Sequence, residues 1–177
     1  QYTMPPYMSA NLIYEGEPRL QALFEEGRIA RSIVVEERDE YIGIIGATTP
    51  ALSYISSPRN VEVIEDVAAV VQTEVDKLEA MGVNKIMLIS HLQDIDGDIA
   101  LASQISGLDI MVAGGGDELL ANPGDALIPG DETDLFGPYP MTATTLDGQD
   151  IPVVTTSGQY GYVGRLVVGF DKVGNVI

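Results

Sequence analysis

The 177-residue sequence contains no cysteine, only one histidine and few basic side chains. Without cysteine, disulfides, thiolate metal sites and cysteine nucleophiles are excluded. Nine Lys and Arg residues stand against 27 Asp and Glu residues, which gives a net charge of -18. Nucleic-acid polymers need clustered basic residues, so this charge excludes them as partners. The charge also disfavours anionic membranes, and no apolar run approaches the ~20 residues of a membrane span.

A packed core is nevertheless expected, because hydrophobic residues make up 45% of the chain. A chain of this length can bury such a core as one domain. We find no linker, low-complexity segment or internal repeat, so residues 1–177 are interpreted as a single unit. The sequence does not begin with methionine, and we expect it to be a processed or excised piece of a longer protein.

The first part of the chain predicts a hairpin followed by a loop and a helix. Runs 29–36 and 40–48 are rich in β-branched residues and are separated by three charged residues, as in paired strands. Prolines within 49–58 predict a loop there. A helix is expected from the N-cap Asp66 to Met81, closed by Gly82. Its buried stripe comprises Val67, Val70, Val71, Val75, Leu78 and Met81.

The rest of the chain predicts a mixed sheet. The apolar run 85–90 is expected to be a strand covered on both faces. A short helix with Asp98 as its N-cap and a second buried strand at 109–113 complete a parallel βαβ core. Three later β-rich runs, 141–145, 151–156 and 165–170, suggest an antiparallel end to the sheet. The predicted fold class is therefore α/β, with a parallel core and antiparallel C-terminal strands.

Two polar groups directly follow the predicted core strands. His91 follows the strand at 85–90, and the run 114–118 (GGGDE), which contains Asp117, follows the strand at 109–113. Ligands of open α/β sheets bind at the carboxyl ends of strands, so His91 and Asp117 are candidate metal ligands. An imidazole and a carboxylate suit Zn, Mn, Fe or Mg better than copper.

Each of these signals also has a structural interpretation. His91 could be a hydrogen-bonded structural residue, and the glycine run could be a tight turn that needs positive φ. The acidic region between Lys85 and Arg165, which has no basic residue, fits a solvated surface as well as a cation-attracting face.

Three familiar motifs fail on this sequence. The glycine run has neither the order of a phosphate-binding loop nor a nearby lysine. A calcium loop starting at Asp94 would need glycine at Ile99 and glutamate at Ile105. Ser157 lacks the Gly-x-Ser-x-Gly context of a serine hydrolase.

A series of segments resembles one enzyme family. The most telling are AMGVNKIMLISHL, DIALA and GLDIMVAGG, which occupy residues 80–92, 98–102 and 107–115. Residues 7–12, 42–50 and 158–170 add further matches. In order and spacing these segments resemble the bifunctional 5′-nucleotidase branch of the calcineurin-like metallophosphoesterases.

The resemblance implies part of a four-layer αββα sandwich that holds two divalent metal ions, such as Zn, Mn, Fe or Ca. It implies that His91 is a metal ligand. The family usually continues with Gly-His-x-His, where this chain has Gly114-Gly115-Gly116-Asp117. Asp117 stands at the second histidine and can still coordinate, whereas Gly115 stands at the first and cannot.

The resemblance also implies that residues 1–177 are the C-terminal half of a metallophosphoesterase domain. The family's earlier ligand segments and its downstream nucleotide-binding domain are absent. One imidazole and one carboxylate cannot hold two ions ~3.5–4 Å apart, so we expect the isolated chain to be inactive. The exposed sheet face should bind the missing half of the domain or cause self-association.

Three functions remain open. The first is part of a metal-dependent phosphoric ester hydrolase acting on phosphomonoesters or nucleotides, periplasmic or extracellular as the resemblance implies. The second is a non-catalytic, degenerate binding module of the same fold, which the substitution at Gly115 suggests. A third, a small-molecule α/β binding protein, rests on fold analogy alone.

Overall fold

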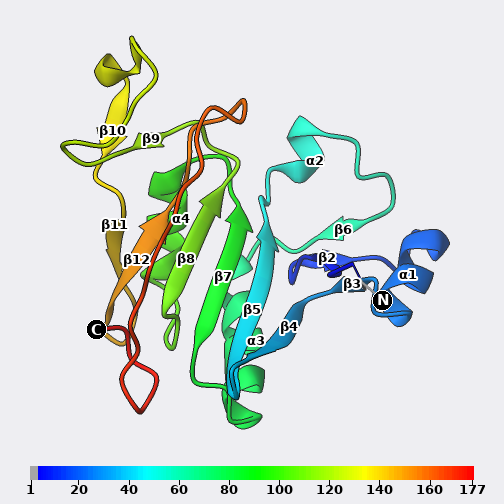
Figure 1. Ribbon diagram of the computed structural model, residues 1–177. Coiled ribbons are helices and arrows are strands. Elements are labelled where there is room, and N and C mark those ends of the chain that lie inside the picture. The colour runs from blue at the N-terminus through cyan, green and yellow to red at the C-terminus, as the bar shows by residue number, and fades with distance from the viewer. Residues whose placement is uncertain (1–3) are drawn as a thin grey trace.

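A computed structural model describes residues 4–177; Gln1, Tyr2 and Thr3 lie outside the described residues. Its central element is a six-stranded mixed sheet with the order β11-β12-β8-β7-β5-β4 (Figure 1). The strands are β4 (Ser32–Glu37), β5 (Glu40–Thr48), β7 (Ile86–His91), β8 (Ile110–Gly114), β11 (Met141–Thr144) and β12 (Asp150–Val154). The inner strands β5, β7, β8 and β12 run parallel, and β4 and β11 are antiparallel edge strands.

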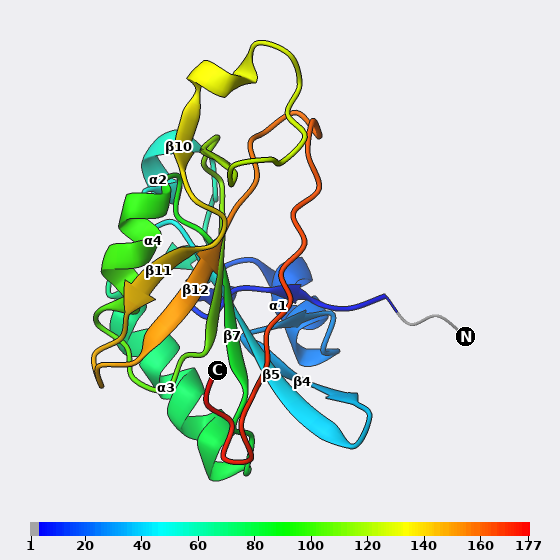
Figure 2. The same ribbon diagram turned by 60° about the vertical axis from the view of Figure 1, so that its left-hand side comes forward.

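Two helices cover one face of this sheet. They are α3 (Val67–Ala80) and α4 (Ile95–Ala102), and Figure 2 shows both on one side of the sheet with the C-terminal segment on the other. Asp66 caps α3 by accepting a hydrogen bond from the backbone N–H of Ala69 at 3.1 Å. Gly82, just past the helix end, has a φ of 85°, the left-handed conformation typical of a helix C-terminus. None of the helices within residues 4–177 is long and apolar enough to span a membrane.

Smaller elements lie at the two sides of the central sheet (Figure 1). Three short strand pairs join β1 to β3, β2 to β6, and β9 to β10. Their bounds are β1 (Tyr7–Met8), β2 (Leu12–Ile13), β3 (Ile29–Ala30), β6 (Glu62–Val63), β9 (Leu119–Leu120) and β10 (Leu135–Gly137). The remaining helices are α1 (Pro18–Glu25), α2 (Leu52–Ile55) and the 3₁₀ turn η1 (Asp131–Thr133).

The predicted α/β class and mixed sheet are confirmed, as are the hairpin and helix α3. Strands β4 and β5 pair in antiparallel register through a two-residue turn at Arg38 and Asp39. Both turn residues have positive φ, 53° and 64°, as the primed turns that match strand twist require. The antiparallel pair β11–β12 confirms two of the three predicted C-terminal runs.

The third C-terminal run, 165–170, is not a strand. Apart from one isolated bridge between Phe170 and Val176, these residues lie outside the strands. The segment passes in front of β12 and β8 instead of adding to the sheet edge (Figures 1 and 2). Its β-like composition therefore predicted the extended conformation but not the missing partner strand.

Three local predictions are also wrong. Helix α4 begins at Ile95 with Asp94 as its N-cap, and Asp98 lies inside the helix, buried. The expected loop 49–58 contains the short helix α2. Met81 is 62% exposed rather than part of the buried stripe, because it follows the last residue of α3.

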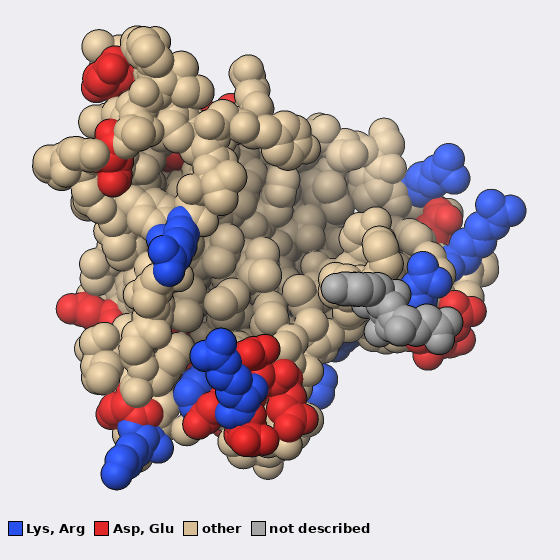
Figure 3. Space-filling model, in the orientation of Figure 1, with Lys and Arg blue, Asp and Glu red and all other residues tan. Residues whose placement is uncertain are grey.

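Strand β7 is buried on one face only, although its apolar run predicted cover on both. Leu88 faces the helices and is fully buried, whereas Ile89 on the opposite face is 37% exposed. Alternation along paired strands puts Ile44, Met87, Ile89 and Val112 together on that second face. We call it the open face. Figure 3 views the molecule from this side and shows an uncharged, hollowed centre with charged residues at its margins.

Candidate functional site

The carboxyl ends of three parallel strands form one edge of the sheet. His91, the last residue of β7, pairs with Thr48 of β5 and with Gly114 of β8. The backbone carbonyl of His91 accepts a hydrogen bond from the N–H of Thr49 at 2.9 Å, which continues the pairing past the strand end. The loops that follow these strands therefore start side by side, as the sequence predicted.

The imidazole of His91 packs on the glycine loop that follows β8. His91 has the parity of Ile89 along β7, so its side chain belongs to the open face. Gly115 has a φ of 95°, and a Cβ atom built there would lie 2.7 Å from Cδ2 and 2.9 Å from Nε2 of His91. Glycine at 115 thus gives both the left-handed backbone and the space for the ring.

Asp117 and Glu118 leave the same loop in different directions. The exposed carboxylate of Asp117 lies against Gly158, on the segment that follows β12. Glu118 Oε1 accepts a hydrogen bond from the N–H of Ile95 at 3.1 Å and so anchors the loop to the start of α4. The loop that carries Asp117 is therefore held between α4 and the segment after β12.

A buried polar pair lies on the other face of the sheet, beneath His91. Ser90 Oγ is 2.5 Å from Oδ1 of Asp98 and 3.3 Å from the carbonyl oxygen of Val112. Asp98 is 1% exposed. Burial raises its pKa to about 7; the hydrogen bond to Ser90 opposes this rise, and the nearby Asp94 and Glu118 add to it.

Sequence reasoning missed this pair, because Asp98 was assigned to a helix N-cap. The available signal was Ser90, a hydroxyl at a helix-facing position of an otherwise apolar strand. The first aspartate of the run, Asp94, is the N-cap and accepts a hydrogen bond from the N–H of Gly97 at 2.7 Å.

A cavity of about 870 Å³ lies between the open face and the C-terminal segment. Its lining includes Val112 of the sheet, the loop residues 114–116, and Tyr162 and Leu166 of the C-terminal segment. Ligand pockets commonly have about 300–1,000 Å³, so this cavity is large enough for a small molecule. It reaches Gly115, the residue on which the His91 ring packs.

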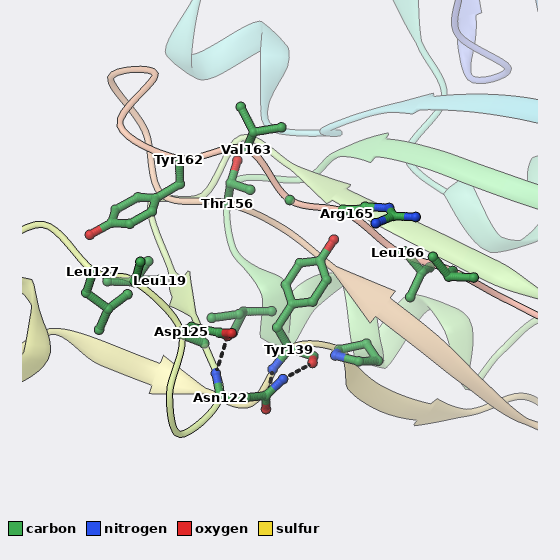
Figure 4. Close-up of a pocket in the computed structure, with 16 residues that line it drawn as sticks. Leu119, Asn122, Asp125, Leu127, Tyr139, Thr156, Tyr162, Val163, Arg165 and Leu166 are labelled. Carbon is green, nitrogen blue, oxygen red and sulfur yellow. Dashed lines mark hydrogen bonds between the residues drawn. The ribbon is translucent and has the colours of Figure 1, made fainter.

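A second cavity of about 540 Å³ adjoins the first on the other side of residues 162–166 (Figure 4). Leu119 and Leu127 lie across it from Arg165 and Leu166, with Tyr139 between them. Asn122 holds Tyr139 in place, because its side chain hydrogen bonds to the backbone N–H and C=O of Tyr139. Arg165 is the only basic residue between Lys85 and Lys172.

The residues present do not fit a two-metal centre on their own. Within residues 4–177 no group of three or more His, Asp or Glu side chains is arranged to hold a metal ion. Near the cavity the predicted donors are the imidazole of His91 and the carboxylate of Asp117, which pack on different glycines. A two-ion site would need several further ligands per ion.

Comparison with known proteins gives a consistent result. The chain is 32% identical to the 5′-nucleotidase of Bos taurus over 176 residues. It is 31% identical to the snake venom 5′-nucleotidase of Naja atra over 172 residues. The crystal structure of the 5′-nucleotidase precursor from Thermus thermophilus superimposes with a TM-score of 0.80 at 32% sequence identity. This chain is homologous to part of the 5′-nucleotidases.

The likeness covers nearly all of this chain but a minor part of its 5′-nucleotidase relatives. In each of these three comparisons 97% of this chain is matched, against 29% of the bovine, 31% of the Naja atra and 32% of the Thermus thermophilus protein. No protein-family model matches the chain. The predicted resemblance to 5′-nucleotidases is confirmed, and the mixed sheet belongs to the fold of those enzymes.

Proposed function

We propose that this chain forms the C-terminal half of the catalytic domain of a metal-dependent phosphoric ester hydrolase. Its substrates are nucleotides or other phosphomonoesters, and its divalent ions, two in the intact protein, activate the attacking water. His91 and Asp117 contribute metal ligands from this chain, and the remaining ligands come from the other half of the domain. The observation that carries the proposal is the homology to 5′-nucleotidases along 97% of the chain.

The position of His91 supports this assignment. It lies at the carboxyl end of a central parallel strand, where α/β sheets bind ligands. The cavity of about 870 Å³ reaches the adjacent glycine loop, which leaves room for a phosphomonoester beside the imidazole. The acidic loops around this edge would lower the energy of a bound cation.

The isolated chain is proposed to be inactive, because the donors it supplies are too few for a two-ion site. The partner that completes it is the missing half of its own domain. Its docking surface is the open face, which is apolar at Ile44, Met87, Ile89 and Val112 and free of charge at its centre (Figure 3). Without that partner we expect the chain to self-associate through this face.

The C-terminal segment supports the same docking surface. Residues 162–170 alternate between half-buried and exposed side chains, and Val163 is 96% exposed. Within the described part of the chain, residues 158–168 make no backbone-to-backbone hydrogen bond. An extended segment with unpaired backbone groups can accept an added strand.

A second candidate function is a non-catalytic binding module of the same fold. The packing of the His91 ring on Gly115 favours it, because that contact gives the imidazole a structural role. We further propose a periplasmic or extracellular location, which the likeness to a venom enzyme supports.

Phosphatase assays separate the two functions. The chain is assayed with Mn²⁺, Zn²⁺ and Ca²⁺, first alone and then joined to the upstream half of its domain. The enzyme proposal expects activity only in the joined protein, with losses of at least ~100-fold for His91→Ala and Asp117→Ala. Asp96→Ala, which removes an exposed carboxylate from α4, is the matched control. A joined protein that binds no transition metal and is inactive would leave the binding module.

A further inference from the structure

The carboxyl group of Asp98 is anomalous among the buried groups of this molecule. Its Oδ2 atom is buried and has no hydrogen-bond partner among the described residues. The charged groups that act on it are two further carboxylates, Asp94 and Glu118. A buried carboxylate without a partner and near like charges is strongly disfavoured, whereas a neutral carboxylic acid is not.

The hydrogen count at Ser90 leads to the same assignment. Ser90 Oγ has one proton but two oxygen neighbours, Oδ1 of Asp98 at 2.5 Å and the carbonyl of Val112 at 3.3 Å. A hydroxyl donates one hydrogen bond and accepts others. Both contacts are hydrogen bonds at once only when Asp98 donates to Ser90 and Ser90 donates to Val112.

We propose that Asp98 is a protonated positioning residue that ties α4 through Ser90 to Val112. The chain of donors runs from Asp98 in α4 to Ser90 in β7 and on to the backbone of β8. Ser90 directly precedes His91, and Val112 lies two residues before Gly114, where the glycine loop begins. The proton on Asp98 thus holds together the ends of the two strands that carry the candidate ligands.

This device titrates near neutral pH. Burial raises the pKa of Asp98 from 3.8 to about 7, with Asp94 and Glu118 as the charged groups facing it. In the unfolded chain the same carboxyl group loses its proton near pH 4. The folded state therefore binds one extra proton between about pH 4 and 7, and stability falls as pH rises through this range. The inference stands independently of the proposed hydrolase function.

The test compares Asp98→Asn and Asp98→Ala with the unchanged chain. Asparagine keeps a donor to Ser90 Oγ but does not titrate. From pH 4 to 7 the unfolding equilibrium constant of the unchanged chain should rise, relative to that of Asp98→Asn, by up to ~10-fold per pH unit. Asp96→Asn, an exposed carboxylate in the first turn of the same helix, should keep the pH dependence of the unchanged chain.

The single histidine supplies a second readout. At pH 5 the imidazole ¹H–¹⁵N signals of His91 should move in Asp98→Ala and stay near their original positions in Asp98→Asn, because only the latter keeps the donor to Ser90. The carboxyl ¹³C signal of Asp98 should titrate near pH 7. The proposal is overturned if that signal titrates near pH 4, or if Asp98→Asn and the unchanged chain share one pH dependence of stability.

Discussion

The two faces of the central sheet are built from the same strands, yet they differ in how completely they are covered. On the face toward α3 and α4, Ile45, Leu88 and Met111 are fully buried. On the open face, Ile89 of the same strand β7 keeps 37% of its surface exposed. The side chains of both faces are apolar, so composition does not distinguish them. What differs is whether this chain supplies the covering layer, and for the open face it supplies only the C-terminal segment.

The largest expected effect comes from truncating each face in turn. Leu88→Ala should lower the free energy of unfolding by about 2–5 kcal/mol, because it leaves a cavity beneath α3 and α4. Ile89→Ala should lower it by about 1 kcal/mol in the chain alone, because its side chain is already partly in water. Urea unfolding of both variants measures the difference. Equal losses would show that the open face is covered in solution.

Gly115 tests how firmly the open face is packed at the site. Gly115→Ala puts a side chain on a left-handed backbone and against the His91 ring, so a loss of about 2 kcal/mol is expected. Gly124→Ala is the matched control, because Gly124 also has positive φ but nothing within 4 Å of an added Cβ; it should cost about 1 kcal/mol. Thermal unfolding that ranks the two variants equally would contradict the packing of His91 on Gly115.

Helix α3 provides a smaller effect on the covered face. Asp66→Ala removes the side-chain hydrogen bond to the N–H of Ala69 and should cost about 1 kcal/mol. Glu65→Ala changes the neighbouring exposed carboxylate, which makes no capping hydrogen bond, and should cost less than about 0.5 kcal/mol. Chemical denaturation of the two variants resolves this difference.

The smallest change in stability should accompany the clearest change in association. Ile89→Ser adds a polar group to the centre of the open face, where the chain alone exposes apolar surface to water. We expect the unchanged chain to form dimers or larger species in light scattering and Ile89→Ser to shift toward monomer. Val35→Ser alters an exposed position near the edge hairpin and serves as the control. A compact monomer of the unchanged chain would contradict the proposed docking surface.

Local signals predicted the elements whose partners are close in sequence. Asp66 and Gly82 bracket α3, and the turn at Arg38 and Asp39 joins β4 to β5. The same signals misplaced the start of α4, because Asp94 and Asp98 are both good N-cap residues. The choice between them depends on tertiary contacts. Glu118, 23 residues from Ile95, satisfies the N–H of the first helical residue, and Ser90 engages Asp98 inside the core.

The candidate site divides in the same way. His91 and the glycine loop were predicted at one sheet edge from strand order, and the pairing of His91 with Gly114 agrees. The contact between the imidazole and Gly115, and that between Asp117 and Gly158, join residues far apart in the chain. The assignment of His91 and Asp117 as metal ligands stays a prediction.

The sequence by itself determined the α/β class, the parallel core and the likeness to 5′-nucleotidases, because side-chain periodicity and motif order are local or strictly ordered along the chain. Only the tertiary structure decided which sheet face is covered, where the C-terminal segment runs and how Asp98 is buried. These features depend on contacts between distant segments. An apolar strand such as β7 has the same sequence pattern whether one of its faces is covered or both.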